Sequence, residues 1–332
     1  MGMILLYIFI CSFVLSLLLI PMTIRIGMKF NILKPAKNHI GKPCIGGAGI
    51  YAAFLAGILT SLFFIRLPVV KLTAIIFSSL IIIIVGLIDD IKDLRPFLKI
   101  AGQLLGILIL MAFGFSTKIV FIPVWLNMVI TAAWILFITN AFNLLDIMDG
   151  LTAGLVVIIS LSLLAVAFLN KDIFSCAILA ALIGSYLAFL KYNYPPAKVY
   201  MGDTGSLFAG FLLAVIAINI SYAPVDRKVA LLTPILAMSL PIYDTLFLIA
   251  MRIRKKNPIF NKTRDHFALR LVAMGCSIKK STWIMYGFSA FLALAAITMA
   301  FSKNLTGLVV IIVVGLVFIL MGKRVGMVNI ED

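Results

Sequence analysis

The sequence is poor in charged residues, in histidine and in paired cysteines. Only 12% of its 332 residues are charged, whereas about a quarter are charged in a soluble domain, so a soluble globular protein is excluded. Two histidines are too few for a multi-histidine metal site. The four cysteines are scattered and form no CxxC pair, which argues against a disulfide framework or a zinc site.

Long apolar runs take the place of the missing charge. Apolar residues make up 64% of the chain, and the mean hydropathy is +1.20. Runs of roughly twenty apolar residues, each long enough to cross a bilayer as a helix, recur from end to end. The sequence predicts an all-α polytopic membrane protein, one integral membrane domain over 1–332, with about eleven transmembrane helices. The expected spans are 3–22, 44–65, 72–88, 98–115, 121–139, 151–169, 173–190, 205–222, 229–250, 282–301 and 305–322.

The basic residues are distributed unevenly between the loops. A net charge of +16 is by itself compatible with nucleic-acid binding. However, alternate loops place 21 of the 28 lysines and arginines on one side of the predicted membrane and 7 on the other. By the positive-inside rule the first side is cytoplasmic, so the N-terminus is expected outside and the C-terminus inside. The basic excess therefore orients the protein and attracts anionic substrates or lipids, and no nucleic-acid partner is expected.

Eight of the twelve acidic residues lie where predicted spans meet the cytoplasmic side. Acids near a membrane core are costly unless they are paired or bind a cation, so they mark a functional site. Asp89 and Asp90 end the third span, and Lys99 follows nine residues after Asp90; adjacent carboxylates repel and tend to share a cation or a proton. A charged span end neutralised by Lys92 and Arg95 is the alternative. The eight acids are Asp89, Asp90, Asp93, Asp146, Asp149, Asp203, Asp244 and Asp265.

The segment NAFNLLDIMDG, at 140–150, is the strongest single motif. Its polar side chains recur at every third position, at Asn140, Asn143, Asp146 and Asp149. On a helix this spacing makes a stripe of neighbouring oxygens. Mg²⁺ prefers few protein oxygens and keeps positions for water and phosphate, so the stripe indicates a magnesium site. A helix cap and turn before Gly150 explains only one of the aspartates.

The segment MGDTGS, at 201–206, precedes another apolar run. Its glycines let the backbone approach a ligand, and the N–H groups at a helix start favour phosphate. Asp203 is placed either as a helix N-cap or as a metal ligand. Because the two motifs described above also indicate a cation site, the metal role of Asp203 is favoured.

Further candidates lie in two basic cytoplasmic loops. In 252–280, Arg264, His266 and Arg270 are suited to clamp a diphosphate or a sugar; topology signalling and lipid contact are the alternative for such a loop. Asp244, in the preceding span after a proline, either faces the polar site or has a structural partner. In the early loop, His39 precedes a Gly46-Gly47 pair, which indicates close backbone packing, ligand approach or a simple turn.

The order of these motifs resembles that of the polyprenyl-phosphate N-acetylhexosamine-1-phosphate transferases. This family includes the undecaprenyl-phosphate GlcNAc-1-phosphate transferases and the phospho-MurNAc-pentapeptide translocase. The shared order is H…P..GG, DD with a lysine nine residues on, N..N..D..DG, GDTGS, and a basic loop with histidine. The resemblance covers nearly the whole chain, from His39 to about Gly275. It implies that a polyprenyl phosphate attacks the sugar-linked phosphorus of a UDP-sugar at the cytoplasmic face of a bacterial inner membrane. UMP then leaves, and a polyprenyl-diphospho-sugar remains.

The resemblance also implies a Mg²⁺ cofactor, with Mn²⁺ as the alternative, and a role for each matching residue. Asn143 and Asp203 match metal ligands, and Lys99 matches a lysine that contacts diphosphate. Asp89 and Asp90 match aspartates that orient or deprotonate the lipid phosphate. The other expected site residues are the catalytic Asp146 and Asp149, which line the nucleotide-sugar site, and the substrate-binding Asn140, His39, Arg264, His266 and Arg270. The expected partners are the UDP-sugar, polyprenyl phosphate, membrane lipids and, from the family, a second copy of the chain.

The chain departs from the family in its last large loop. Many bacterial members carry two or three histidines there, whereas this chain has Ala268 and Leu269 after His266. The translocase branch is marked by a triple histidine, so the GlcNAc branch fits better. The early loop also has a single proline, Pro43, where many members have two.

Three other classes of protein compete with this interpretation. A CDP-alcohol phosphatidyltransferase also has D-x-x-D-G, but it needs Ala-Arg and two more aspartates soon afterwards, and here an apolar run follows Gly150. A lipid or ion transporter predicts polar residues at mid-span and on both sides of the membrane. An inactive homologue is suggested by the missing histidines.

Overall fold

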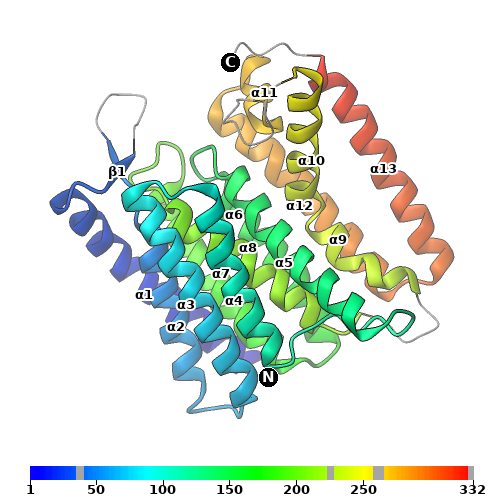
Figure 1. Cartoon of the computed structure of the whole chain (residues 1–332), viewed down its shortest axis with the longest axis horizontal. Coiled ribbons are helices and arrows are strands. Elements are labelled where there is room, and N and C mark those ends of the chain that lie inside the picture. The colour runs from blue at the N-terminus through cyan, green and yellow to red at the C-terminus, as the bar shows by residue number, and fades with distance from the viewer. Residues whose placement is uncertain (35–40, 223–227, 257–264, 328–332) are drawn as a thin grey trace. The chain divides into compact units, whose positions relative to one another are not determined.

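The computed structural model is almost wholly helical and forms two compact units, residues 1–221 and 222–332 (Figure 1). It describes residues 1–34, 41–222, 228–256 and 265–327. Each unit is treated by itself below. The single domain over 1–332 stays a prediction.

The first unit consists of eight helices and a short hairpin. The hairpin pairs Leu33 with Pro43 and Lys34 with Lys42 in antiparallel register. In chain order the elements are α1 (Gly2–Lys29), β1 (Leu33–Lys34), β2 (Lys42–Pro43), α2 (Gly46–Ser61), α3 (Val69–Lys92), α4 (Pro96–Ala112), α5 (Val124–Leu145), α6 (Leu151–Leu169), α7 (Ile173–Asn193) and α8 (Gly202–Asn219).

Helices α7 and α8 form the centre of this unit. In the most apolar stretch of each, 83% of the residues are buried, against 28% in α1. Helix α1 packs on α7 and α2, and α8 packs on α3 and α5 (Figure 1). A helix that is apolar on all sides is expected either in a core or against lipid. The burial therefore assigns α7 and α8 to the core and leaves much of α1 facing outward.

Helix α1 continues through Pro21, which has no N–H to give to the carbonyl of Leu17. The hydroxyl of Tyr192, on α7, donates to that carbonyl at 3.0 Å. A backbone oxygen released by proline inside an apolar bundle needs such a partner, since no water is present there. The contact thus fastens α1 to α7 at the position where proline weakens the helix.

Two glycines bring the start of α8 against neighbouring backbone. A Cβ atom on Gly47 would lie 2.2 Å from the backbone nitrogen of Gly205. Gly202 has φ +68°, and a Cβ there would lie 2.1 Å from the carbonyl oxygen of Cys44. Hydrogen bonds from the N–H of Gly46 and Gly47 to the carbonyls of Tyr200 and Met201 hold the approach. Of the meanings left open for the Gly-Gly pair, close backbone packing is the one confirmed.

The second unit consists of helices only, within the residues described. Its elements are η1 (Lys228–Leu232), α9 (Thr233–Ala237), α10 (Ser239–Arg254), α11 (Phe267–Ala273), α12 (Ile278–Phe301) and α13 (Asn304–Gly326). The expected span 229–250 is helical but interrupted, because the segments 228–237 and 239–254 meet at an angle of 70°. Pro241 lies in the first turn of α10 and cannot donate to the carbonyl of Ala237, so a continuous helix loses a hydrogen bond there.

Eight helices in the described part of the chain are long and apolar enough to span a membrane, or nine if the bent pair forms one span. Helices α2 and α4, with 16 and 17 residues, are apolar but shorter. Every expected span coincides with helix, and the chain is a multi-pass membrane protein. The count of eleven spans and the outside location of the N-terminus stay predictions.

Candidate active site

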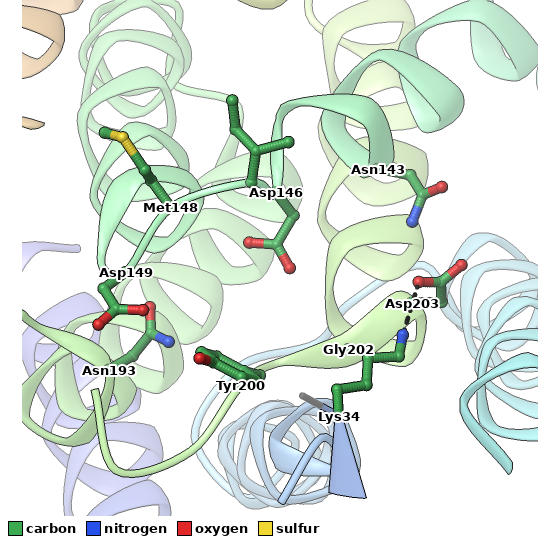
Figure 2. A pocket seen from close by; sticks show the side chains of 10 residues that line it. Lys34, Asn143, Asp146, Met148, Asp149, Asn193, Tyr200, Gly202 and Asp203 are labelled. Carbon is green, nitrogen blue, oxygen red and sulfur yellow. Dashed lines mark hydrogen bonds and ion pairs between the residues drawn. The ribbon is translucent and has the colours of Figure 1, made fainter. Parts of the chain in front are cut away.

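A cavity of about 360 Å³ opens among the polar motifs of the first unit. Its walls come from the hairpin, the end of α5, the loop that follows it, and the segment that leads into α8 (Figure 2). The cavity is lined by Lys34, Asn143, Asp146, Ile147, Met148, Asp149, Asn193, Tyr200, Gly202 and Asp203. The motifs NAFNLLDIMDG and MGDTGS therefore meet at one site, although about fifty residues separate them.

Lys99, on α4, lies among oxygens from three other helices. Its Nζ is 3.1 Å from Oδ2 of Asp89 and 3.0 Å from Oδ1 of Asn143. It also donates to Oδ2 of Asp203. The side chain of Lys99 is only 15% exposed. One cation thus holds together the end of α3, the end of α5 and the start of α8. The expected contact of Lys99 with diphosphate stays a prediction.

Asp90 does not lie free beside Asp89 but caps the start of α8. Its Oδ1 accepts from the N–H of Asp203 at 2.8 Å, and its Oδ2 accepts from the N–H and the hydroxyl of Thr204 at 3.0 and 2.7 Å. A carboxylate is stabilised at a helix start because that end carries partial positive charge. The cap of α8 is therefore Asp90 and not Asp203, and these two N–H groups donate to a carboxylate of the chain rather than to phosphate.

Lys34, on β1, is a site residue that the sequence analysis did not single out. Its Nζ lies 2.9 Å from Oδ1 of Asp90. It lies 3.3 Å from Oδ1 of Asp203, the contact drawn in Figure 2. Burial lowers the pKa of this ammonium, but the charges of Asp90 and Asp203 outweigh burial, and the net pKa is raised above its ordinary value. Lys34 therefore stays charged at neutral pH. In the sequence, Lys34 is one of several basic residues of a loop that is expected on the cytoplasmic side, and no motif surrounds it.

The loop after α5 brings two further carboxylates to the cavity. Asp146 is half-buried, and burial, helped by the charge of Asp203, raises its pKa to about 7. Asp149 accepts from the N–H of Ala197 at 2.9 Å. Asn193 ties the same loop to α7, since its Oδ1 accepts from the N–H of Gly150 at 3.0 Å. Asp149 and Asn193 both line the cavity (Figure 2), and Asn193 was missed because nothing in the sequence around it indicates a site.

Asn140, the first member of the polar stripe, does not line the cavity. Its Nδ2 donates to Oε1 of Gln103 at 2.7 Å and to the carbonyl of Leu136 at 2.8 Å. Gln103 is fully buried. Asn140 thus fastens α5 to α4 one turn before the site. Its expected contact with substrate stays a prediction.

The expected residues of the basic loop form two buried side-chain pairs in the second unit. Nδ1 of His266 lies 2.8 Å from Oδ2 of Asp244, and NH2 of Arg270 donates to Oδ1 of Asp265 at 2.6 Å. All four residues are less than 5% exposed. Asp244 therefore has the structural partner left open above. His39 and Arg264 lie outside the described residues.

The surroundings of Lys99 also show whether a divalent cation fits the site. The oxygens of Asn143, Asp203 and Asp89 converge on one ammonium group, which stands where a small cation can be bound. Two carboxylates and one amide suit Mg²⁺, because this ion completes its shell with water and substrate phosphate. The described residues contain no group of three His, Cys, Asp or Glu side chains suited to a metal.

Comparison with known proteins gives the same family by two routes. The model of glycosyl transferase family 4 matches residues 72–221, all within the first unit. A probable undecaprenyl-phosphate N-acetylglucosaminyl 1-phosphate transferase of Bacillus subtilis is 30% identical, over 97% of this chain and 92% of that protein. A decaprenyl-phosphate N-acetylglucosaminephosphotransferase of Mycobacterium leprae is 29% identical, over 81% of this chain and 76% of the relative.

A relative with a different printed name is also similar. A phospho-N-acetylmuramoyl-pentapeptide-transferase of Streptococcus gordonii is 31% identical, over 63% of this chain and 72% of its own length. Because the Bacillus protein matches nearly end to end, the similarity includes the second unit and not only the cavity. The chain therefore belongs to glycosyl transferase family 4, the polyprenyl-phosphate N-acetylhexosamine-1-phosphate transferases.

Proposed function

We propose that this protein transfers GlcNAc-1-phosphate from UDP-GlcNAc to polyprenyl phosphate at the cytoplasmic face of a bacterial inner membrane. The observation that carries the proposal is the convergence of Asp89, Asn143 and Asp203 on Lys99 beside the cavity. A diphosphate brings negative charge to a site, so a site that handles it needs cations held by fixed oxygens. The names of the relatives supply the sugar and the lipid carrier.

The reaction needs no covalent intermediate on the protein. An oxygen of the polyprenyl phosphate attacks the phosphorus that carries the sugar. A new phosphorus–oxygen bond forms, and the bond from that phosphorus to the oxygen bridging the diphosphate breaks. The bridging oxygen keeps the electron pair and leaves with UMP. The products are UMP and polyprenyl-diphospho-GlcNAc, so atoms and charge balance without any further reactant.

The proposed roles of the residues are to bind the substrates, to orient them and to neutralise the charge of the diphosphate. Lys99 and Lys34, both fixed on carboxylates, are placed to receive diphosphate oxygens. Asn143 and Asp203 would hold Mg²⁺, with Asp89 next to them. Bound Mg²⁺ would supply a Lewis acid that takes up charge developing on the diphosphate. Asp90 positions Asp203 through the start of α8.

The remaining residues are proposed to bind the nucleotide-sugar. Asp146 and Asp149 line the cavity with Tyr200, whose ring lies 5.3 Å from the ammonium of Lys42. His266 and Arg270 in the second unit, together with His39 and Arg264, are proposed substrate contacts by their match to the family. Ala268 and Leu269 cannot make the polar contacts of the histidines they replace.

The test is UMP release by the purified chain in detergent. The reaction contains undecaprenyl phosphate and UDP-GlcNAc, and the two controls omit the lipid or replace Mg²⁺ by a chelator. We expect release only when lipid and divalent metal are both present. Other UDP-N-acetylhexosamines are then compared, and the highest kcat/KM identifies the sugar. Absence of release with every sugar would contradict the proposal and favour an inactive homologue.

A further inference from the structure

The second unit contains a cavity that the transfer reaction does not explain. It has a volume of about 740 Å³ and lies between the C-terminal ends of α10 and α13 and helix α11. We propose that this cavity binds the phosphate of an anionic phospholipid of the surrounding membrane. It is lined by Met251, Arg254, Lys255, Arg270, Gly322, Lys323, Gly326 and Met327.

The charge of the lining has one sign. Of the eight described residues of the lining, four are lysine or arginine and none is acidic. Asp265, just behind the lining, pairs with Arg270 at 2.6 Å and with Lys255 at 3.1 Å. In the part of the chain that the structure describes, Arg254 and Lys323 have no carboxylate within ion-pair distance. Two exposed cations, Arg254 and Lys323, without a described carboxylate beside them indicate a site that an external anion neutralises.

The wall of the cavity is rigid where Arg270 forms it. The guanidinium is 2% exposed, and its NH1 donates to the carbonyl of Val325 at 3.3 Å. Its Nε donates to the carbonyl of Asp265, also at 3.3 Å, and the ring of Phe247 lies 5.4 Å away. Arg270 is therefore held as a fixed positive charge. The exposed side chains of Arg254 and Lys323 can move toward a phosphate at the mouth.

The position of the cavity on the helices favours a lipid over a soluble anion. Helix α13 is 23 residues long and apolar, and only 11% of its most apolar stretch is buried, so most of its surface faces outward. Leu316, Ile319 and Leu320, in the turns before the cavity, are 54, 57 and 63% exposed. A phosphate held by Lys323 would place acyl chains along these leucines and the isoleucine. Basic residues at the end of an apolar helix lie at the level of lipid head groups.

The basic end of both helices also fits the expected orientation. Helices α10 and α13 each carry two basic residues in their last turn. By the positive-inside rule this end faces the cytoplasm, where the leaflet is rich in anionic lipid. Among the described residues, the lining has no aromatic ring on which a uracil base would stack. The geometry therefore points to a phospholipid head group rather than to the nucleotide-sugar.

The test measures thermal unfolding of the full chain in a neutral detergent with added lipid. We expect phosphatidylglycerol to raise the Tm in a saturable way and phosphatidylcholine to leave it unchanged. The double variant Arg254→Gln/Lys323→Gln should bind phosphatidylglycerol about 30-fold more weakly, from the loss of two cations at an anionic surface. Both side chains are exposed, so the variant should fold with the Tm of the unchanged chain when no lipid is present.

The control is Lys279→Gln/Lys280→Gln, at the start of α12. These lysines are exposed, belong to the same unit and do not line the cavity. Equal weakening in both double variants would show a general effect of net charge and would overturn the proposal. Glycerol phosphate that matched phosphatidylglycerol would show a site for free anions. Stabilisation by polyprenyl phosphate or UDP-GlcNAc that is lost only in the Arg254/Lys323 variant would make this part of the substrate site. Either result would also overturn the proposal.

Discussion

The two units use the same kinds of charged side chain in opposite ways. In the first unit, Asp203 is shared between Lys34 and Lys99, and these partners are 15 to 37% exposed around a cavity. In the second, Asp244 and Asp265 are fully buried and pair with His266 and Arg270. Shared and partly exposed charges can exchange partners with a substrate, whereas buried pairs fix the positions of helices. The surroundings of a charge, more than its type, thus indicate whether it serves chemistry or architecture.

The largest expected effect tests whether the shared charges of the first unit take part in the reaction. Asp203→Asn removes the charge that Lys34 and Lys99 share, and it should lower kcat for UMP release roughly 10³-fold, as when a main electrostatic contact of a transition state is lost. The Tm should change little. The matched control is Asp172→Asn, which weakens the N-cap of α7 in the same unit, and it should keep full turnover. Near-normal turnover of Asp203→Asn would remove Asp203 from the proposed metal site.

The structural half is tested by Arg270→Met. This change removes the ion pair of Arg270 with the buried carboxylate of Asp265 and the contact with the end of α13. We expect a loss of about 3 kcal/mol in the free energy of unfolding, as for a broken buried ion pair. The double variant Arg270→Met/Asp265→Leu should recover part of the lost free energy of unfolding, because it also removes the buried carboxylate. Thermal unfolding in detergent measures both, and an unchanged Tm for the single variant would contradict the structural role.

A smaller effect separates the two lysines of the first unit. Lys99 contacts both proposed metal ligands, whereas Lys34 contacts Asp203 but not Asn143. In the absence of substrate, Lys99→Met should tighten Mn²⁺ binding roughly tenfold more than Lys34→Met, because it removes the ammonium from the cation position as well as one charge. Titration followed by electron paramagnetic resonance measures free Mn²⁺. Equal tightening in both variants would mean that charge alone matters.

The smallest effect concerns pH. Burial raises the pKa of Asp146 to about 7, against about 3.9 in an unfolded chain. The folded state therefore binds this proton more tightly, so the stability that it contributes is present below pH 4 and is lost as pH rises through 7. Asp146→Asn has no such proton. Its Tm should exceed that of the unchanged chain by a few °C more at pH 8 than at pH 5. A difference that is constant with pH would contradict the raised pKa.

The sequence predicted the helices and most of the first site for one physical reason. Polar side chains, and acids above all, are so costly at a membrane that their positions indicate where a site lies, and Asp89, Asn143 and Asp203 do meet at Lys99. The sequence analysis missed Lys34, because basic residues are common in cytoplasmic loops whether or not they belong to a functional site. It assigned Asn140 to the same stripe, but a repeat of three drifts around a helix of 3.6 residues per turn. Asn140 consequently meets Gln103 instead.

Other features depend on contacts between distant segments and could not be predicted. The sequence shows two adjacent aspartates, but not that Asp90 caps α8 while Asp89 faces Lys99. Pro241 was visible, but whether a helix bends at proline depends on what fills the broken turn. The basic loop was expected to be a substrate clamp, and only packing reveals that Arg270 is buried against the end of α13.

The central claim is that the chain transfers a phospho-sugar and not a sugar. The most direct measurement is mass spectrometry of both products after incubation with UDP-GlcNAc, polyprenyl phosphate and Mg²⁺. The account predicts UMP and a lipid that carries two phosphates and one GlcNAc, with both products formed roughly 10³-fold more slowly by Asp203→Asn. UDP together with a lipid that carries one phosphate would show attack at the sugar carbon and would contradict the account.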